Sequence, residues 1–285
     1  MKRILFFSVV LLLICACNKS VQNVNQIRFN VSFPQTGTKA TASAFEAGDE
    51  ISLYAVEYEA GEQMPLQIGG NYFNNERVVF NGSSWTGVRS LFWSDKACDF
   101  YALYPYQADI TSVDKYTFSL AQDQNGDGYE ASDLLFAKTE NVVSGDGAVN
   151  LQFKHLMSKC VVKVIKGENF EGDIPVDIVS HIYNTCTSCF INCATGSVEK
   201  DSFGAKNTIT MKKISNSLFE AVLVPQNIEN RTPLIELTLG GIAYLLDYSL
   251  SFRPGYVYTI DITLNTSPDQ EQIEISIDPG VNNWN

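Results

Sequence analysis

The chain has 285 residues, of which 45% are hydrophobic, 12% aromatic and 18% charged. This balance is typical of a folded globular protein and excludes a disordered one, which would have few apolar residues and a high charge density. The formal net charge of −12, from 20 basic and 32 acidic residues, excludes nucleic acid as a partner, because phosphate backbones are bound by clustered lysine and arginine.

The N-terminus has the features of an export signal. Lys2 and Arg3 precede a mostly apolar run at positions 4–14. The run is shorter than the roughly 20 residues that a membrane-spanning helix needs. It ends in Ile-Cys-Ala-Cys, which resembles the lipobox of bacterial lipoproteins, and an ordinary signal peptide is the alternative. We predict a signal peptide at 1–16, lipid attachment at Cys17 and a lipidated tether over 17–25.

Alternation of apolar and polar residues with period two dominates the rest of the chain and predicts strands rather than helices. Many short strands separated by turn residues predict an all-β fold of two β-sandwich domains in tandem. We assign the N-terminal sandwich to 26–166 and the C-terminal sandwich to 167–285, with one short helix over 131–137. The predicted strands cover residues 27–33, 51–57, 76–80, 99–104, 116–120, 149–153, 159–166, 176–183, 189–193, 208–211, 218–224, 234–239, 242–248, 256–264 and 273–277.

Residues 123–130, Asp-Gln-Asn-Gly-Asp-Gly-Tyr-Glu, resemble the first half of a calcium-binding loop. Oxygen-bearing side chains lie at alternate positions, and a glycine permits the turn. The twelfth position of such a loop, where a bidentate carboxylate completes the coordination shell, is Leu134. The sequence therefore favours an ordinary hairpin loop over weak calcium binding at Asp123 to Glu130.

Cys186, Cys189 and Cys193 form a second cluster, with His181 upstream. Structural zinc sites use four ligands, commonly as two close pairs separated by a loop, and these residues are instead crowded into strand-like sequence. On a strand, Cys186 would face away from the other two. We predict that most cysteines are small apolar residues with at most one or two disulfides, and a metal site or a redox pair is the minor alternative.

Evidence for catalysis is weak. The two histidines, His155 and His181, lie in no recognised nucleophile, metal or phosphate-binding motif. We therefore predict that the chain is not an enzyme, with no catalytic residue, no cofactor and no metal site. Trp85, Trp93 and Trp284 could stack against sugars, although packing in the core or at an edge is favoured for the first two. Trp284 is the least expected in a core.

An ordered series of motifs resembles the fimbrillin family. It begins with Ile27-Arg28-Phe29, Thr38-Lys39-Ala40 and Phe-Glu-Ala-Gly-Asp-Glu-Ile at 45–51. The resemblance covers nearly the whole mature chain. It implies two transthyretin-like β-sandwiches and a role as a subunit of type V pili on the outer surface of Gram-negative bacteria. The later motifs are Asp-Phe-Tyr-Ala-Leu-Tyr-Pro-Tyr at 99–106, Gln-Asp-Gln at 122–124, Ser-Asp-Leu-Leu-Phe-Ala at 132–137, Phe-Lys-His-Leu-Met-Ser-Lys at 153–159 and Arg-Pro-Gly-Tyr-Val-Tyr at 253–258.

The resemblance also implies assembly by strand exchange. A protease would cut the loop after the first strand, that strand would leave, and a strand from the next subunit would enter the groove. Lys39 is the only basic residue between Arg28 and Arg77, which makes it the candidate processing site. The alternative is that both exchanging strands are permanent. The candidate displaced strand carries Ile27, Phe29, Val31 and Phe33, and the candidate donor strand carries Ile273, Ile275 and Ile277.

The implied location is the cell surface, in a fimbrium, with a lipid anchor in the outer membrane. Other pilus subunits are the implied partners, and a host or bacterial surface ligand is a further candidate. A periplasm-facing anchor stays open, because no acidic cluster follows Cys17. The alternative function is a monomeric outer-membrane surface lipoprotein that binds glycans.

Overall fold

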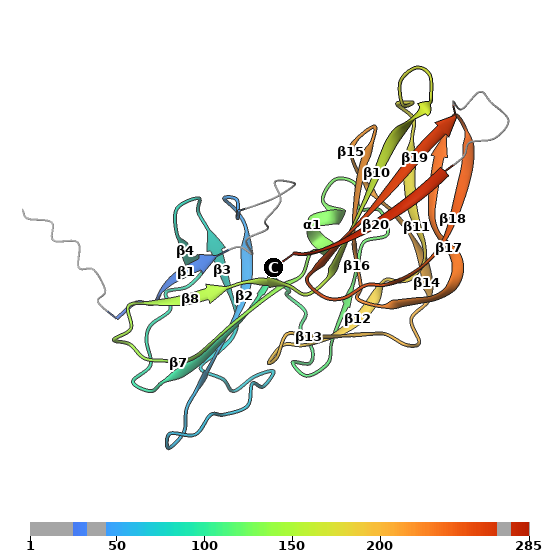
Figure 1. The fold of residues 1–285 in the computed structure, drawn as a ribbon. Helices are drawn as coiled ribbons and strands as arrows, with labels where there is room; N and C mark the ends of the chain where they lie inside the picture. The colour runs from blue at the N-terminus through green and yellow to red at the C-terminus, as the bar shows by residue number, and fades with distance from the viewer. Residues whose placement is uncertain (1–24, 33–43, 267–274, 285) are drawn as a thin grey trace, which may run out of the picture.

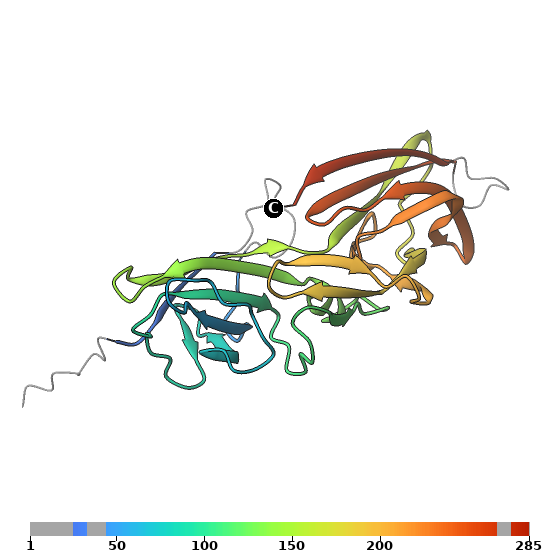
Figure 2. The same ribbon diagram turned by 90° about the horizontal axis from the view of Figure 1, so that it is seen from below.

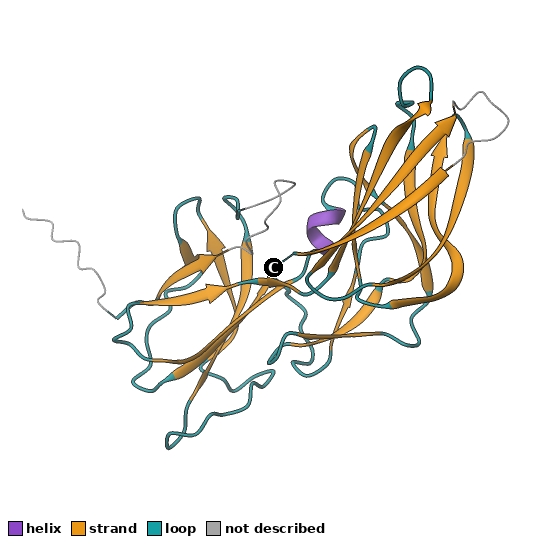
Figure 3. Cartoon of the chain, viewed as in Figure 1, coloured by secondary structure: helices purple, strands orange, loops and turns teal. Residues whose placement is uncertain are grey.

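The computed structural model describes residues 25–32, 44–266 and 275–284. Within these ranges the chain forms twenty β-strands and one short α-helix, so the prediction of a β-sheet protein is confirmed (Figures 1 and 3). The molecule is elongated, with the early strands at one end and the late strands at the other (Figure 2). The described residues include no helix that is long and apolar enough to cross a membrane.

The N-terminal sheet has eight strands in the order β8-β1-β4-β3-β2-β5-β7-β9. Its strands cover a cluster of buried apolar side chains, the N-terminal cluster, which includes Ile51, Leu53, Phe100, Val149 and Leu151. The strand bounds are β1 (Arg28–Ser32), β2 (Glu50–Glu57), β3 (Phe73–Phe80), β4 (Trp85–Gly87), β5 (Cys98–Tyr104), β7 (Leu135–Val142), β8 (Ala148–Gln152) and β9 (Lys154–His155).

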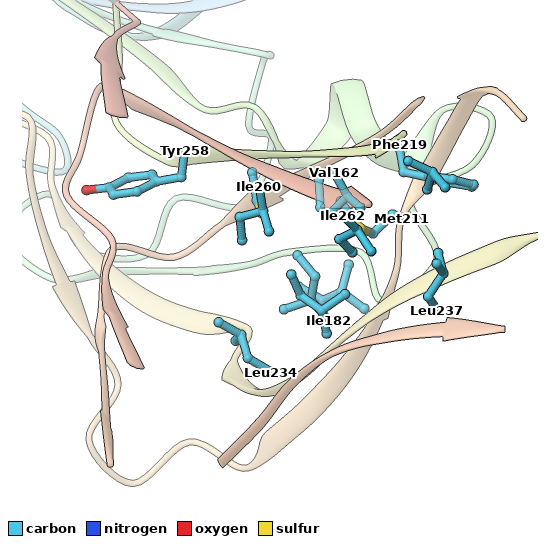
Figure 4. Close-up of a cluster of buried hydrophobic side chains, with 14 of the residues drawn as sticks. Val162, Ile182, Met211, Phe219, Leu234, Leu237, Tyr258, Ile260 and Ile262 are labelled. Atoms are coloured by element: carbon cyan, nitrogen blue, oxygen red, sulfur yellow. The ribbon is translucent and has the colours of Figure 1, made fainter. Parts of the chain in front are cut away.

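Two sheets at the other end of the molecule enclose a second cluster, the C-terminal cluster. Figure 4 shows Val162, Phe219 and Ile260 from one sheet facing Ile182 and Leu237 from the other. The five-stranded sheet consists of β15 (Lys212–Ser215), β16 (Leu218–Leu223), β10 (Ser158–Asn169), β19 (Tyr256–Thr266) and β20 (Ile275–Asn283), and the four-stranded sheet of β14 (Lys206–Thr210), β11 (Val179–Cys186), β17 (Asn227–Leu239) and β18 (Ile242–Ser251).

A third buried cluster joins the two ends. It combines Tyr54 and Tyr101 of the N-terminal sheet with Cys189, Val222 and others from the second half of the chain, and we call it the junction cluster. The small sheet beside it crosses between the halves, because β6 pairs with β12. Position 166, the predicted domain boundary, lies inside β10, whose two partners β16 and β19 both come later in the chain. This part contains β6 (Tyr116–Ser119), β12 (Ser188–Asn192), β13 (Ser197–Lys200) and α1 (Gly128–Ser132).

The predicted helix over 131–137 is wrong. The helix α1 ends at Ser132, and β7 begins at Leu135. Leu135 to Ala137 are buried on both faces of the strand, so they lack the alternation that marks strands with one wet face. The helix starts at Gly128, where a Cβ would lie 2.0 Å from the carbonyl oxygen of Asp123, so only glycine permits this close approach.

Candidate functional site

Strand β1 overlaps the candidate displaced strand and contains Phe29 and Val31, with Ile27 directly before it. It lies between β4 and β8, antiparallel to β4 and parallel to β8. Ile27 and Phe29 are buried in the N-terminal cluster, and Val31 is half-buried against it. The inward side of β1 therefore carries the apolar residues that the alternation predicted, and Phe33 lies outside the described residues.

The backbone ties β1 into its surroundings at both ends. The N–H of Ile27 donates to the carbonyl oxygen of Leu91 at 2.9 Å, and the N–H of Phe153 donates to that of Ser32 at 3.1 Å. Since buried backbone groups need partners, loss of β1 would leave the facing groups of β4 and β8 without theirs. A strand of similar apolar pattern could replace those bonds.

A groove of about 1480 Å³ runs along β1. Val31 and Leu151 form part of its wall, together with Phe45, Phe80 and Trp85. The ring centroids of Phe45 and Trp85 are 5.0 Å apart in an edge-on contact. Within the described part of the chain, one side of β1 therefore borders a groove whose walls combine these apolar side chains with polar ones such as Asn150 and Gln152.

Strand β20 contains two residues of the candidate donor strand. Ile275 pairs with Leu264 of β19 and Ile277 with Ile262, in antiparallel register. β20 is the edge strand of the five-stranded sheet, next to β19 alone. The other predicted positions, Ile273, Lys39 and Cys17, lie outside the described residues.

Trp284 was the tryptophan least expected in a core, and this expectation is wrong. Trp284 is 5% exposed and belongs to the junction cluster. The ring stacks on His155 with centroids 3.7 Å apart and an interplanar angle of 10°. The ammonium group of Lys159 lies 5.9 Å from the ring centroid, within cation–π range. The end of β20 lies near the middle of the molecule, between the two groups of sheets (Figures 1 and 2).

Two buried polar pairs surround Trp284. Nδ1 of His155 lies 2.8 Å from a carboxylate oxygen of Asp133, and Nζ of Lys159 lies 2.8 Å from a carboxylate oxygen of Glu220. The Lys159 and Glu220 side chains are 5% and 1% exposed. Charged groups this deeply buried are stable only when they are paired. No local sequence pattern marks this grouping, because Glu220 and Trp284 lie far along the chain from His155 and Lys159.

Trp85 and Trp93 are buried in the N-terminal cluster, as expected for core packing. Trp284 is also buried, so little of any of the three tryptophan side chains is open to a sugar. A glycan-binding function would need other residues.

The loop at 123–130 is organised by its own hydrogen bonds. Asp123 accepts from the backbone N–H of Asn125 at 3.0 Å and from its side-chain amide at 2.9 Å, and these bonds lower the pKa of the Asp123 carboxyl. The Glu130 carboxylate instead pairs with Lys212 at 2.5 Å. Among the described residues, no group of three or more histidine, cysteine and acidic side chains is arranged to hold a metal ion.

Gln124 within this loop has a structural role that the sequence did not indicate. Its side chain is fully buried, donates to the carbonyl oxygen of Val222 at 2.8 Å and accepts from the N–H of Val222 at 2.7 Å. The amide thus pairs with β16 as a neighbouring strand would, across 98 positions of sequence. The Gln-Asp-Gln motif therefore ties the loop to the second half of the chain.

The five cysteines of the described residues are all buried, and none forms a disulfide. Burial raises the pKa of Cys98 to about 11 and the pKa values of Cys160, Cys189 and Cys193 to about 12. A raised pKa keeps the thiol protonated, and the protonated form is a poor nucleophile and metal ligand. These residues act as small apolar side chains of the core.

We expect the thiols of a soluble form starting at residue 18 to react slowly at pH 8 with an aromatic disulfide reagent. Less than about one thiol per molecule should react within minutes, because burial and the raised pKa values suppress the thiolate. All five should react at once in guanidinium chloride, which serves as the control. Rapid reaction of two or more thiols in the native protein would contradict the buried arrangement.

The comparisons with known proteins agree with the resemblance seen in the sequence. The chain is 30% identical over 165 residues to Fim1C of Bacteroides ovatus, which is named as a candidate fimbrium tip subunit. The aligned part is 52% of this chain and 29% of that protein, so the chain matches less than a third of the relative's length.

Solved structures share the fold. A candidate cell adhesion protein from Bacteroides uniformis has a TM-score of 0.70 at 21% identity, covering 92% of this chain and 98% of the other. A fimbrial protein from Bacteroides vulgatus has a TM-score of 0.54 at 14% identity, covering 92% and 100%. The sequence profile described as Fimbrillin-like matches residues 38–284, which is most of the chain. The chain belongs to the fimbrillin-like family.

Proposed function

We propose that this chain is a structural or adhesive subunit of a type V pilus, built from two transthyretin-like β-sandwiches in tandem. It is exported as a lipoprotein through Cys17 and acts at the cell surface on the outer membrane. Cleavage at Lys39 releases β1, and a strand from a neighbouring subunit takes its place. Membership of the fimbrillin-like family supports the pilus role, and the related proteins are named as fimbrial or cell adhesion proteins.

The placement of β1 is the observation that supports strand exchange best. It has a hydrogen-bonded neighbour on each side, carries apolar residues at alternate positions, and borders an open groove. Strand addition draws its affinity from main-chain hydrogen bonds and its specificity from alternate side chains that fill pockets. An incoming strand would meet both requirements between β4 and β8.

The loop between β1 and β2 contains the single basic residue that a trypsin-like protease needs there. Lys39 follows the strand by a few residues, so a cut would leave Ile27, Phe29 and Val31 on a short separate peptide. Such a peptide is held only by non-covalent contacts and can be replaced by a competing strand.

We expect limited trypsin digestion of the soluble form to cut first after Lys39, because this residue lies in the connection between β1 and β2. Mass spectrometry identifies the cut, and a sizing column then tests whether a matching strand peptide, or another subunit, joins the cut protein. The Lys39→Ala variant is the control and should keep β1 covalently attached. Resistance at Lys39, or a cut after which the groove takes up no strand, would contradict the exchange mechanism.

A further inference from the structure

We infer that Trp284 locks β20 into its own molecule, so that this subunit accepts a strand from a neighbour but does not donate β20. The role in a pilus rests on the proposed function. The retention of β20 by Trp284 is argued from contacts within the chain alone. The sequence left open whether Ile275 and Ile277 belong to a donor strand or to a permanent strand of this molecule. The inference favours a permanent strand.

The first step is the seat of the Trp284 ring. The ring is buried, stacks on the imidazole of His155 and lies within cation–π range of the ammonium group of Lys159. Face-on stacking and cation–π attraction add to the burial of a large apolar surface. Removing this ring from its seat would expose both the indole and the cavity that it fills.

The second step is that the seat is preformed by other parts of the chain. His155 is held by Asp133 at 2.8 Å, and Lys159 by Glu220 at 2.8 Å. The backbone N–H of Trp284 donates to the carbonyl oxygen of Gly255 at 2.8 Å. The residues that surround the Trp284 ring come from β9, β10, β16 and the turn before β19. This binding position therefore does not depend on β20 itself.

The third step is the pairing of β20 with β19. Nine residue pairs, from Leu264 with Ile275 to Tyr256 with Asn283, join the two strands in continuous antiparallel register. A donor strand has to be available to another molecule. Here the strand would have to break its pairing along its whole length and also pull a buried tryptophan from the junction cluster.

A subunit that keeps β20 in its own sheet exchanges strands at the β1 groove, where it accepts a strand from a neighbour. The partner chemistry that fits the accepting side is an extended peptide with apolar residues at alternate positions, matching Ile27, Phe29 and Val31.

Hydrogen exchange measured by mass spectrometry tests the lock in the intact soluble protein. We expect slow exchange for residues 275–283 in the wild type, and exchange about tenfold or more faster in Trp284→Ala. Trp284→Phe keeps a ring against His155 and should restore slow exchange. Val281→Ala changes a residue of the same strand that is 47% exposed, and it should leave the exchange unchanged.

Peptides from β2 and β5 report whether Trp284→Ala is still folded, because these strands lie in the N-terminal sheet. Rapid exchange of residues 275–283 in the wild type overturns the lock. Equal exchange in the wild type and a folded Trp284→Ala variant also overturns it.

A second experiment tests separately whether one molecule donates β20 to another. Protein cut at Lys39 is mixed with a labelled synthetic peptide of residues 26–33, and its size is measured with and without the peptide. We expect the peptide to bind and the wild-type protein alone to stay monomeric. Self-assembly in which β20 of one molecule lies in the groove of another overturns the inference. Failure of the peptide to bind would contradict the strand exchange in the proposed function. The hydrogen-exchange experiment would still test whether Trp284 holds β20 in its own molecule.

Discussion

Replacing Glu220 by leucine is expected to lower the free energy of unfolding by about 3–5 kcal/mol. The carboxylate is 1% exposed and lies 2.8 Å from the ammonium group of Lys159, which is itself buried. The substitution removes the carboxylate that offsets the charge of this buried ammonium. Chemical denaturation followed by circular dichroism measures the change.

A double-mutant cycle shows whether the loss comes from the unbalanced charge. The variant Lys159→Met/Glu220→Leu should recover most of the stability, because two apolar side chains of similar size replace the pair. Lys138 and Glu140 form a pair whose side chains are 28% and 57% exposed, and Glu140→Leu should shift the denaturation midpoint very little. A double variant as unstable as Glu220→Leu alone would show that burial of the charge is not the cause.

Replacing Phe219 by alanine is expected to destabilise the protein by about 3–5 kcal/mol. The side chain is fully buried in the C-terminal cluster, where Figure 4 shows it beside Val162 and Met211. Truncation removes its apolar contacts and leaves a cavity between two sheets that cannot close fully. Thermal and chemical denaturation both measure the effect.

Phe203 is the matched control, because its side chain is fully exposed in the turn before β14. Phe203→Ala should leave the denaturation midpoint unchanged. A large loss at Phe203, or a small one at Phe219, would contradict the packing of the C-terminal cluster.

Much of the fold could be predicted from the sequence because strands with one wet face alternate. β1, β8 and β18 show this alternation and were found close to their observed bounds. The alternation fails where a strand is buried on both faces, and Leu135 to Ala137 of β7 were therefore mistaken for helix. Membership of the fimbrillin-like family was predicted from ordered short motifs and is confirmed. Members of the family are structural subunits, so the prediction that the chain is not an enzyme is also confirmed.

The site was predicted less completely, for a physical reason. The displaced strand could be recognised because its alternation is local. The contacts of Trp284 and of Gln124 join residues many positions apart, and nothing in the neighbouring sequence marks their partners. Pairing of this kind depends on the completed fold, so a single sequence does not reveal it.

The small sheet that joins β6 to β12 has a mechanical consequence. A pulling force applied at the two ends of the molecule passes through this sheet, through the Gln124 amide paired with Val222, and through the junction cluster. Because several hydrogen bonds and a packed core carry the load together, they have to fail together rather than one after another. The N-terminal and C-terminal sheets would therefore resist being pulled apart, and they would move together as one rigid unit.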